Sequence, residues 1–276
     1  MMHLDRNKVK KFLNGQIDQL NHVMADLDEY TAQLETNYYR VAIFGSARTR
    51  ENDPWYTHVT NLAKALSEKG VDVVTGGGPG LMEAANKGAK LGGHQIRSIG
   101  VSIELPFEQD SNQHLDIKKS HRRFSSRLDE FMRISQAVIV TPGGLGTLLE
   151  LFYTWQLLQV EHINERPIIL FGKEFWQGLM DWICKIPVEQ NMLSPEDMDH
   201  VHLFDSVEEI IDFLEPQVEH FYRKSKSYIN KSLISSEAFQ KLNKLHDNTQ
   251  KSFDEIIDEA IIHMYKLHQS DENDAQ

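Results

Sequence analysis

The stretch AVIVTPGGLGTLLE, residues 137–150, decides the fold of this chain. It begins with four apolar residues that favour a buried strand, passes a proline and three glycines, and continues into a run typical of a helix. A buried strand that turns through glycines into a helix is the repeating unit of parallel α/β sheets. The stretch therefore predicts a strand over 137–144 and a helix over 146–160.

The same unit recurs along the middle of the chain. Short runs rich in Val, Ile and Leu predict strands at 41–45, 71–77, 96–105, 137–144 and 166–172. Helical patterns between and after them predict helices near 56–69, 79–91, 122–135, 146–160, 174–185 and 206–214. This alternation predicts an α/β fold, a Rossmann-like doubly wound parallel sheet with helices on both faces.

The two ends of the chain predict added helices. Apolar residues recur every seven residues near the N-terminus, at Leu13, Leu20, Leu27 and Leu34, and at helical spacing from Ser235 to Leu267. The leucine stripe suits a coiled coil, and both helices equally suit packing on their own core or on each other. The chain thus divides into an N-terminal helical extension at 1–39, a central α/β domain at 40–214 and a C-terminal helical extension at 215–276.

Composition excludes several classes of protein. The 276 residues include 29 basic and 41 acidic side chains, a net charge of −12, which disfavours non-specific nucleic-acid binding but not a small anionic ligand. The single cysteine, Cys184, excludes a disulfide framework and favours a reducing, cytoplasmic location. No stretch approaches the roughly 18 apolar residues of a membrane helix, and no signal peptide is apparent, so we expect no membrane partner.

Two glycine clusters each follow a predicted strand and open a predicted helix: GGGPGLMEAANKGA (76–89) and PGGLGTLLE (142–150). Glycines let a ligand approach the backbone closely, and the free amides of a helix N-terminus favour phosphate. Either cluster alone also suits a tight turn without a ligand. Because parallel strands end at one edge of a sheet, a single nucleotide can touch both clusters.

Other phosphate motifs are missing from the two clusters. Neither cluster has the Gly-Lys-Ser/Thr of a Walker A loop, and neither is GxGxxG. The sequence therefore disfavours kinase-type phosphoryl transfer and a dinucleotide-dependent dehydrogenase.

Four motifs stand in order after predicted strands: FGSAR (44–48), GGGPGLMEAANKGA (76–89), LPFEQ (105–109) and PGGLGTLLE (142–150). Together they resemble the Lonely Guy (LOG) family, the cytokinin riboside 5′-monophosphate phosphoribohydrolases, over about residues 40–214. The older label of this signature, lysine decarboxylase, has no support from a pyridoxal-binding lysine motif. The resemblance implies hydrolysis of the N-glycosidic bond of a nucleoside 5′-monophosphate, giving free base and ribose 5-phosphate. It implies no cofactor and no metal.

The resemblance also implies roles for individual residues. Glu150, which ends the PGGxGTxxE signature, stabilises the oxocarbenium-like transition state and orients or deprotonates water, and Arg127 on the preceding helix holds the phosphate or polarises the departing base. The amides that take the 5′-phosphate belong to Gly143, Gly144, Gly146 and Thr147. The ribose or base side and the closure of the pocket fall to Gly77, Gly78, Gly80, Met82, Gly45 and Ser46. Glu83 either contacts the ligand or is a first-turn acid favoured by the helix dipole.

The chain departs from the family pattern at two positions. Leu128 stands where the family usually has lysine, and Leu149 where many members have an acidic residue. The first departure removes a positive charge and bears on affinity or substrate choice. A homodimer or higher homo-oligomer is implied by the resemblance.

Two further functions are weighed against hydrolysis. A non-catalytic nucleotide-binding sensor or carrier on the same fold is the alternative; Leu128 favours it, whereas retention of both Arg127 and Glu150 argues against it. A structural scaffold built on the terminal helices leaves the two glycine loops unexplained.

Overall fold

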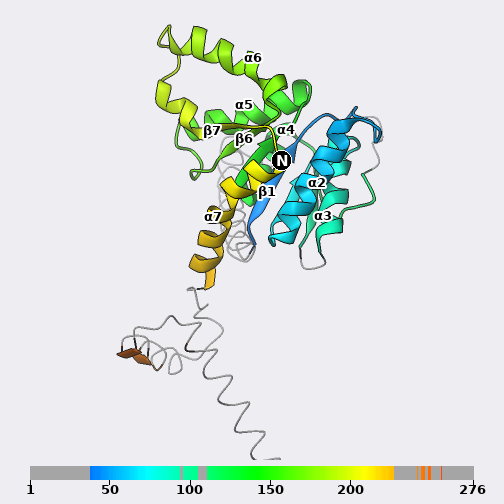
Figure 1. The fold of residues 1–276 in the computed structure, drawn as a ribbon, viewed down its shortest axis with the longest axis vertical. Helices are drawn as coiled ribbons and strands as arrows, with labels where there is room; N and C mark the ends of the chain where they lie inside the picture. Colours follow the sequence, from blue (N-terminus) through cyan, green and yellow to red (C-terminus); the bar gives the residue numbers. More distant parts are fainter. Residues whose placement is uncertain are drawn as a thin grey trace, which may run out of the picture. The chain divides into compact units, whose positions relative to one another are not determined.

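Seven strands form one sheet in which every neighbouring pair is parallel (Figure 1). The computed structural model describes residues 38–93, 96–104 and 111–226, and in addition 241, 244, 245, 248, 249 and 256. The strand order is β4-β3-β2-β1-β5-β6-β7. Because β1 lies between β2 and β5, the chain runs outward in both directions from the middle of the sheet. The predicted doubly wound α/β fold is confirmed.

The five predicted strands are present, and most are shorter than the sequence suggests. The seven strands are β1 (Arg40–Phe44), β2 (Asp72–Thr75), β3 (Ser98–Ile103), β4 (Ile117–His121), β5 (Ala137–Val140), β6 (Ile168–Phe171) and β7 (Val201–Phe204). The prediction of a strand to residue 77 is wrong, because Gly77 turns out of the ladder with a φ of +74°.

Two strands, β4 and β7, are additional to the five predicted from apolar runs. Both lie at the edges of the sheet, where, among the described residues, a strand pairs along one side only. β4 has the sequence IKKSH, in which exposed and half-buried residues alternate, and β7 is half-buried throughout. Edge strands carry charged side chains and lack the continuous apolar run of a central strand.

Six α-helices follow the predicted pattern. They are α2 (Pro54–Glu68), α3 (Leu81–Gly92), α4 (Phe124–Ile134), α5 (Leu145–Gln159), α6 (Lys173–Ile183) and α7 (Val207–Lys226), with a π-helical turn at Cys184–Val188 and a 3₁₀-helix at Pro195–His200. The predicted helix at 206–214 corresponds to α7. The prediction that it ends at 214 is wrong, because α7 continues through Pro216. Proline lacks a backbone N–H and so removes one hydrogen bond of the helix. The backbone hydrogen bonds before and after Pro216 still hold α7 together.

The helices cover both faces of the sheet (Figure 1). Alternate residues of β1 point to opposite faces, so Ala42 and Phe44 lie in one core cluster with Phe131 of α4 and Leu151 of α5. Figure 1 shows α2 and α3 packed side by side on the other face. α4 and α5 therefore approach the same rim of the sheet from the same face.

The carboxyl ends of β1, β2 and β5 lie next to one another in the sheet. Gly45 follows β1, Gly76 follows β2 and Thr141 follows β5. The backbone N–H of Thr141 and its side-chain hydroxyl both donate to the carbonyl of Phe44, at 2.8 and 2.9 Å. This rim is the topological switch point, where open α/β sheets bind ligands.

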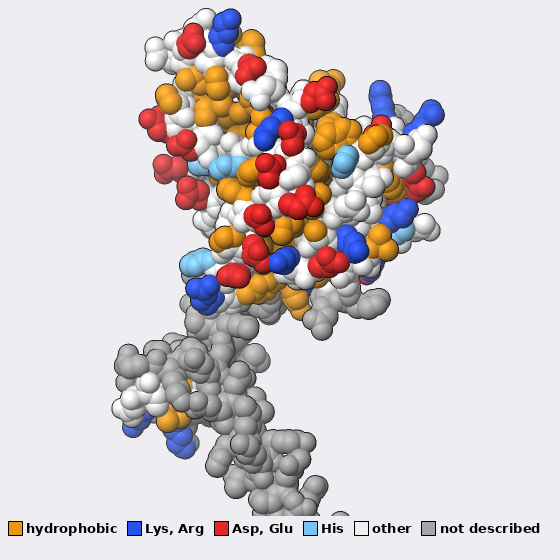
Figure 2. Space-filling model, in the orientation of Figure 1, with side chains coloured by type: hydrophobic (Ala, Val, Ile, Leu, Met, Phe, Trp, Pro, Cys, Tyr) orange, Lys and Arg blue, Asp and Glu red, His pale blue; other side chains and the backbone are white. Residues whose placement is uncertain are grey.

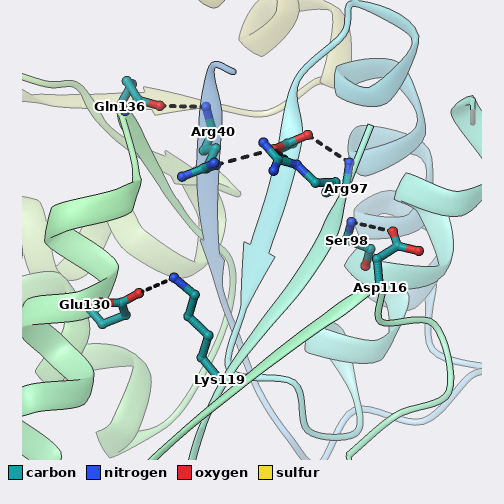
Figure 3. A network of polar contacts seen from close by, with 8 residues as sticks. Arg40, Arg97, Ser98, Asp116, Lys119, Glu130 and Gln136 are labelled. Carbon is teal, nitrogen blue, oxygen red and sulfur yellow. Dashed lines mark hydrogen bonds and ion pairs between the residues drawn. The ribbon is translucent and has the colours of Figure 1, made fainter. Parts of the chain in front are cut away.

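The amino ends of the strands are held by a buried ionic cluster (Figure 3). Asp72, the first residue of β2, is fully buried and accepts from Nε of Arg40 at 3.3 Å and Nε of Arg97 at 3.1 Å. It also accepts from the backbone N–H of Arg97 at 2.8 Å. Asp72 thus links β1 and the start of β3 to β2. It does so at the amino ends of the strands, opposite the carboxyl ends that carry the glycine loops.

The chain divides into two compact units, Met1–Pro216 and Gln217–Gln276. The predicted N-terminal helix with Leu13, Leu20, Leu27 and Leu34 lies outside the described residues, as does nearly all of the predicted helix after Ser235. Within the part of the chain that the structure describes, no helix combines the length and apolar character that crossing a bilayer requires. Acidic side chains are spread over the face shown in Figure 2, interspersed with apolar ones.

Candidate active site

An ion pair between α4 and α5 forms the centre of the candidate site. Nη1 of Arg127 donates to Oε1 of Glu150 at 2.9 Å. The same guanidinium donates through Nε to the carbonyl of Val101 in β3 at 2.9 Å, and it lies 5.0 Å from the centre of the Phe131 ring. Both charged side chains are largely buried, at 12% and 10% exposure. Arg127 is therefore fixed in place by a carboxylate, a strand carbonyl and an aromatic ring.

Glu150 is a carboxylate in a low-dielectric environment. Burial raises the pKa of Glu150, and the guanidinium of Arg127 opposes that rise. A desolvated carboxylate accepts a proton more readily than one in water, and it interacts more strongly with a neighbouring positive charge. These are the properties required of a base, or of a group that stabilises a developing cation.

The first glycine loop lies directly against this ion pair. A Cβ on Gly76 would lie 2.6 Å from Nη2 of Arg127 and 2.7 Å from Sδ of Met82. The loop can approach the guanidinium because this position has no side chain. Gly76 was missing from the site predicted from sequence, although it begins the GGG run that marked the loop.

The other predicted glycines of this loop shape the backbone. Gly77 and Gly80 have φ values of +74° and +71°, which L-residues with side chains seldom adopt. A Cβ on Gly78 would lie 2.9 Å from Cε of Met82, so Met82 covers both Gly76 and Gly78. The predicted group of Gly77, Gly78, Gly80 and Met82 is thus one compact turn that begins α3.

The loop after β1 joins the two glycine loops. The backbone N–H of Ser46 donates to the carbonyl of Pro142 at 3.1 Å, and the carbonyl of Ser46 accepts from the N–H of Leu81 at 2.9 Å. A Cβ on Gly45 would lie 2.2 Å from Oγ1 of Thr141, so glycine is required for this approach. Gly45 and Ser46 therefore lie between the turn that begins α3 and the turn that begins α5.

The second glycine loop opens to solvent at the N-terminus of α5. The N-cap of α5 is Gly144, so no side chain caps the first amides of this helix. Gly144 and Gly146 are exposed, with open space where a Cβ would be. Gly143 packs on Thr147, whose hydroxyl would lie 2.2 Å from a Cβ on Gly143. The first-turn amides and the dipole of a 15-residue helix form an anion-binding geometry.

Glu83 and Leu128 directly follow two residues of this arrangement, Met82 and Arg127. Glu83 of α3 lies near Tyr56 of α2. The pKa of Tyr56 is raised to about 12, mainly by burial and further by the negative charges of Glu83 and Glu51. Leu128, which follows Arg127, is a buried core residue at 6% exposure. Within the described residues, no group of three or more His, Cys, Asp or Glu side chains is placed to hold a metal ion.

Comparison with known proteins gives one family and several relatives. The model of a family described as possible lysine decarboxylase matches residues 82–214. The probable cytokinin riboside 5′-monophosphate phosphoribohydrolase LOGL6 of Oryza sativa subsp. japonica is 26% identical over 189 residues, covering 68% of this chain and 74% of the relative. The cytokinin riboside 5′-monophosphate phosphoribohydrolase LOG1 of Arabidopsis thaliana is 26% identical over 190 residues, covering 67% and 87%.

A bacterial relative has a different name. The pyrimidine/purine nucleotide 5′-monophosphate nucleosidase of Escherichia coli (strain K12) is 31% identical over 147 residues, covering 48% of this chain and 30% of the relative. The names of the plant and bacterial relatives share the nucleoside 5′-monophosphate and differ in the base.

Proposed function

We propose that this chain is a member of the Lonely Guy family and that it hydrolyses the N-glycosidic bond of a nucleoside 5′-monophosphate; the family match and the plant relatives support this. The bond between C1′ of the ribose and the nitrogen of the base breaks, and the oxygen of water bonds to C1′. The products are ribose 5-phosphate and the free base, which takes up a proton. The observation that carries the proposal is the buried Arg127–Glu150 pair beside two glycine loops.

Glu150 supplies the negative charge that this reaction needs. Positive charge grows on the sugar as the C1′–N bond breaks, and a desolvated carboxylate beside C1′ stabilises it. The raised pKa of Glu150 also suits it to orient water and accept its proton. The guanidinium of Arg127 acts as an electrostatic group that holds Glu150 and faces the phosphate or the departing base.

Each of the two glycine loops contacts a different part of the ligand. The open first turn of α5, with Gly143, Gly144, Gly146 and Thr147, suits the 5′-phosphate. The turn of Gly77, Gly78, Gly80 and Met82 lies beside Arg127 and suits the ribose or base side. Gly45 and Ser46 close the space between them. Plant relatives named for cytokinin nucleotides and a bacterial relative named for purine and pyrimidine nucleotides leave both base classes as candidates.

A homo-oligomer is part of this proposal. Leu145, Leu149 and Phe152 stand at i, i+4 and i+7 of α5 and are exposed at 86%, 47% and 42%. An α-helix that is apolar on its solvent side as well as on its core side is normally covered. We propose that a second copy of the chain covers this stripe, and that the enzyme acts in the cytoplasm.

The test is a panel of purine, pyrimidine and cytokinin nucleoside monophosphates incubated with the purified protein, with free base measured by chromatography. We expect release of base from at least one, and loss of at least about a hundredfold in kcat for Glu150→Gln. Glu68→Gln, an exposed glutamate of α2, is the matched control and keeps full activity. Stabilisation by a monophosphate without cleavage would favour a sensor or carrier instead.

A further inference from the structure

Asn112, in the connection between β3 and β4, makes three side-chain hydrogen bonds and one through its backbone N–H. Its Nδ2 donates to the carbonyl of Gly78 at 3.0 Å and to Oδ1 of Asn86 at 2.9 Å. Its Oδ1 accepts from the backbone N–H of His114 at 3.1 Å, and its own N–H donates to the carbonyl of Gly77 at 2.9 Å. At 8% exposure, Asn112 is buried against the first glycine loop.

These contacts hold the loop from one side. The carbonyls of Gly77 and Gly78 both accept from Asn112, and the N–H of Gly77 donates to Oγ1 of Thr75 at 2.9 Å. Because a trans peptide is planar, the N–H of Gly78 points opposite to the carbonyl of Gly77, and so away from Asn112. Asn112 therefore sets the direction of an amide in the loop that lies beside Arg127.

The support behind Asn112 is itself buried and hydrogen-bonded. Oδ1 of Asn86 accepts from the hydroxyl of Thr75 at 2.7 Å, and Nδ2 of Asn86 donates to the hydroxyl of Ser98 at 2.9 Å. Thr75, Asn86 and Ser98 are all fully buried. A buried network in which each side-chain nitrogen and oxygen has a partner favours one geometry, since a change leaves polar groups unpaired.

We propose that Asn112 is a positioning residue for the nucleotide, which presets the first glycine loop and thereby sets the affinity for a nucleoside 5′-monophosphate. The inference rests on the proposed function and adds a residue to it that lies outside both glycine motifs. Asn112 acts through Gly77 and Gly78, whereas its hydrogen bonds do not include Arg127 or Glu150. Its loss weakens binding more than chemistry.

The experiment compares Asn112→Asp with Gln113→Ala, an exposed neighbour in the same segment. Aspartate keeps the shape and the acceptor for His114, but it replaces the donor to Gly78 and Asn86 by an oxygen. We expect KM for the cleaved monophosphate to rise about tenfold with kcat within about twofold, and Gln113→Ala to match the wild type. Amide hydrogen exchange in residues 76–81 rises in Asn112→Asp alone.

A second pair of variants keeps the test decisive if Asn112→Asp does not fold. Thr75→Val removes the hydroxyl that accepts from Gly77 and keeps the shape, whereas Thr75→Ser retains that hydroxyl. We expect the same rise in KM for Thr75→Val and none for Thr75→Ser.

Three outcomes decide the inference. Unchanged KM, or a fall in kcat alone, for Asn112→Asp and Thr75→Val overturns the role of Asn112 and leaves the proposed function standing. A wild type that binds monophosphates without cleaving them overturns hydrolysis, and the dissociation constant then replaces KM in the same comparison. A wild type that neither binds nor cleaves any monophosphate overturns both.

Discussion

A Cβ on Gly76 would lie 2.6 Å from Nη2 of Arg127, so the guanidinium occupies space that any other residue at position 76 would take. The carboxyl end of β2 and the N-terminal half of α4 meet at this point, although they are far apart in the sequence. The close approach makes the placement of Arg127, and through it of Glu150, depend on the absence of a side chain at position 76.

This contact predicts the effect of Gly76→Ala. The added methyl displaces the ends of two side chains, Arg127 and Met82, and leaves the backbone in place, so the protein folds. We expect kcat/KM to fall by about a hundredfold because the arginine shifts. The measurement is turnover together with a thermal melt. Gly178→Ala is the control, since it lies within α6 with open space around it, and it should raise stability by about 0.5–1 kcal/mol without changing turnover. Full activity of Gly76→Ala would show that the arginine position does not matter.

The raised pKa of Glu150 predicts the acid limb of the pH profile. If the ionised carboxylate is needed, kcat/KM falls on acidification at a pH above that of an ordinary glutamate, because burial raises the pKa of Glu150. The profile of kcat/KM between about pH 4 and 8 measures this directly. An acid limb at the ordinary glutamate pKa would place the catalytic carboxylate elsewhere.

The same shift predicts how stability depends on pH. A pKa raised in the folded state means that the folded chain binds the proton more tightly, so this contribution is full below the unfolded pKa and is lost as pH rises through the folded pKa of Glu150. Glu150→Gln removes the ionisation. We expect the stability of Glu150→Gln relative to wild type to increase as pH rises through that window, measured by urea unfolding. A pH-independent difference would contradict the shift.

The buried cluster at the amino ends of the strands predicts a large loss of stability. Asp72→Ala leaves Arg40 and the backbone N–H of Arg97 without their shared acceptor, and we expect a loss of about 3–5 kcal/mol in unfolding free energy. Glu68→Ala, in the exposed Lys64–Glu68 pair, should cost less than about 1 kcal/mol. Equal effects in urea titrations would show that the cluster contributes no more than a surface pair.

The apolar stripe of α5 predicts the oligomeric state. Phe152→Asp places a charge in the proposed interface and should reduce the mass measured by light scattering to that of one chain. Phe175→Asp changes an exposed phenylalanine of α6 and should leave the mass unchanged. A mass that Phe152→Asp does not alter would assign the stripe to another role.

The fold was largely predictable because its signals are local. The central strands β1, β2, β5 and β6 are buried on both faces, so their sequences are nearly all apolar. The edge strand β4 was missed, because IKKSH pairs along one side and its alternate residues are exposed. The continuation of α7 past Pro216 was missed for a different reason. A proline favours the end of a helix but does not enforce it.

The candidate site was predicted in part. The glycine loops and Glu150 carry a motif, and Arg127 was predicted from its position before that motif; the roles of these residues stay predictions. Gly76 and Asn112 were not found, because the first differs from its neighbouring glycines only by what packs on it, and the second lies in a segment without a motif.

The order of apolar runs and glycine turns alone predicted a doubly wound parallel sheet, since a strand buried on both faces and its turn into a helix each have a pattern within neighbouring residues. The strand order, with β1 between β2 and β5, came only from the structure. The meeting of Arg127, Glu150 and Gly76, and the hold of Asn112 on Gly77 and Gly78, arose only when distant elements packed. Their charges and hydrogen bonds depend on distances of a few ångströms across the fold, and those distances are set by how the helices cover the sheet.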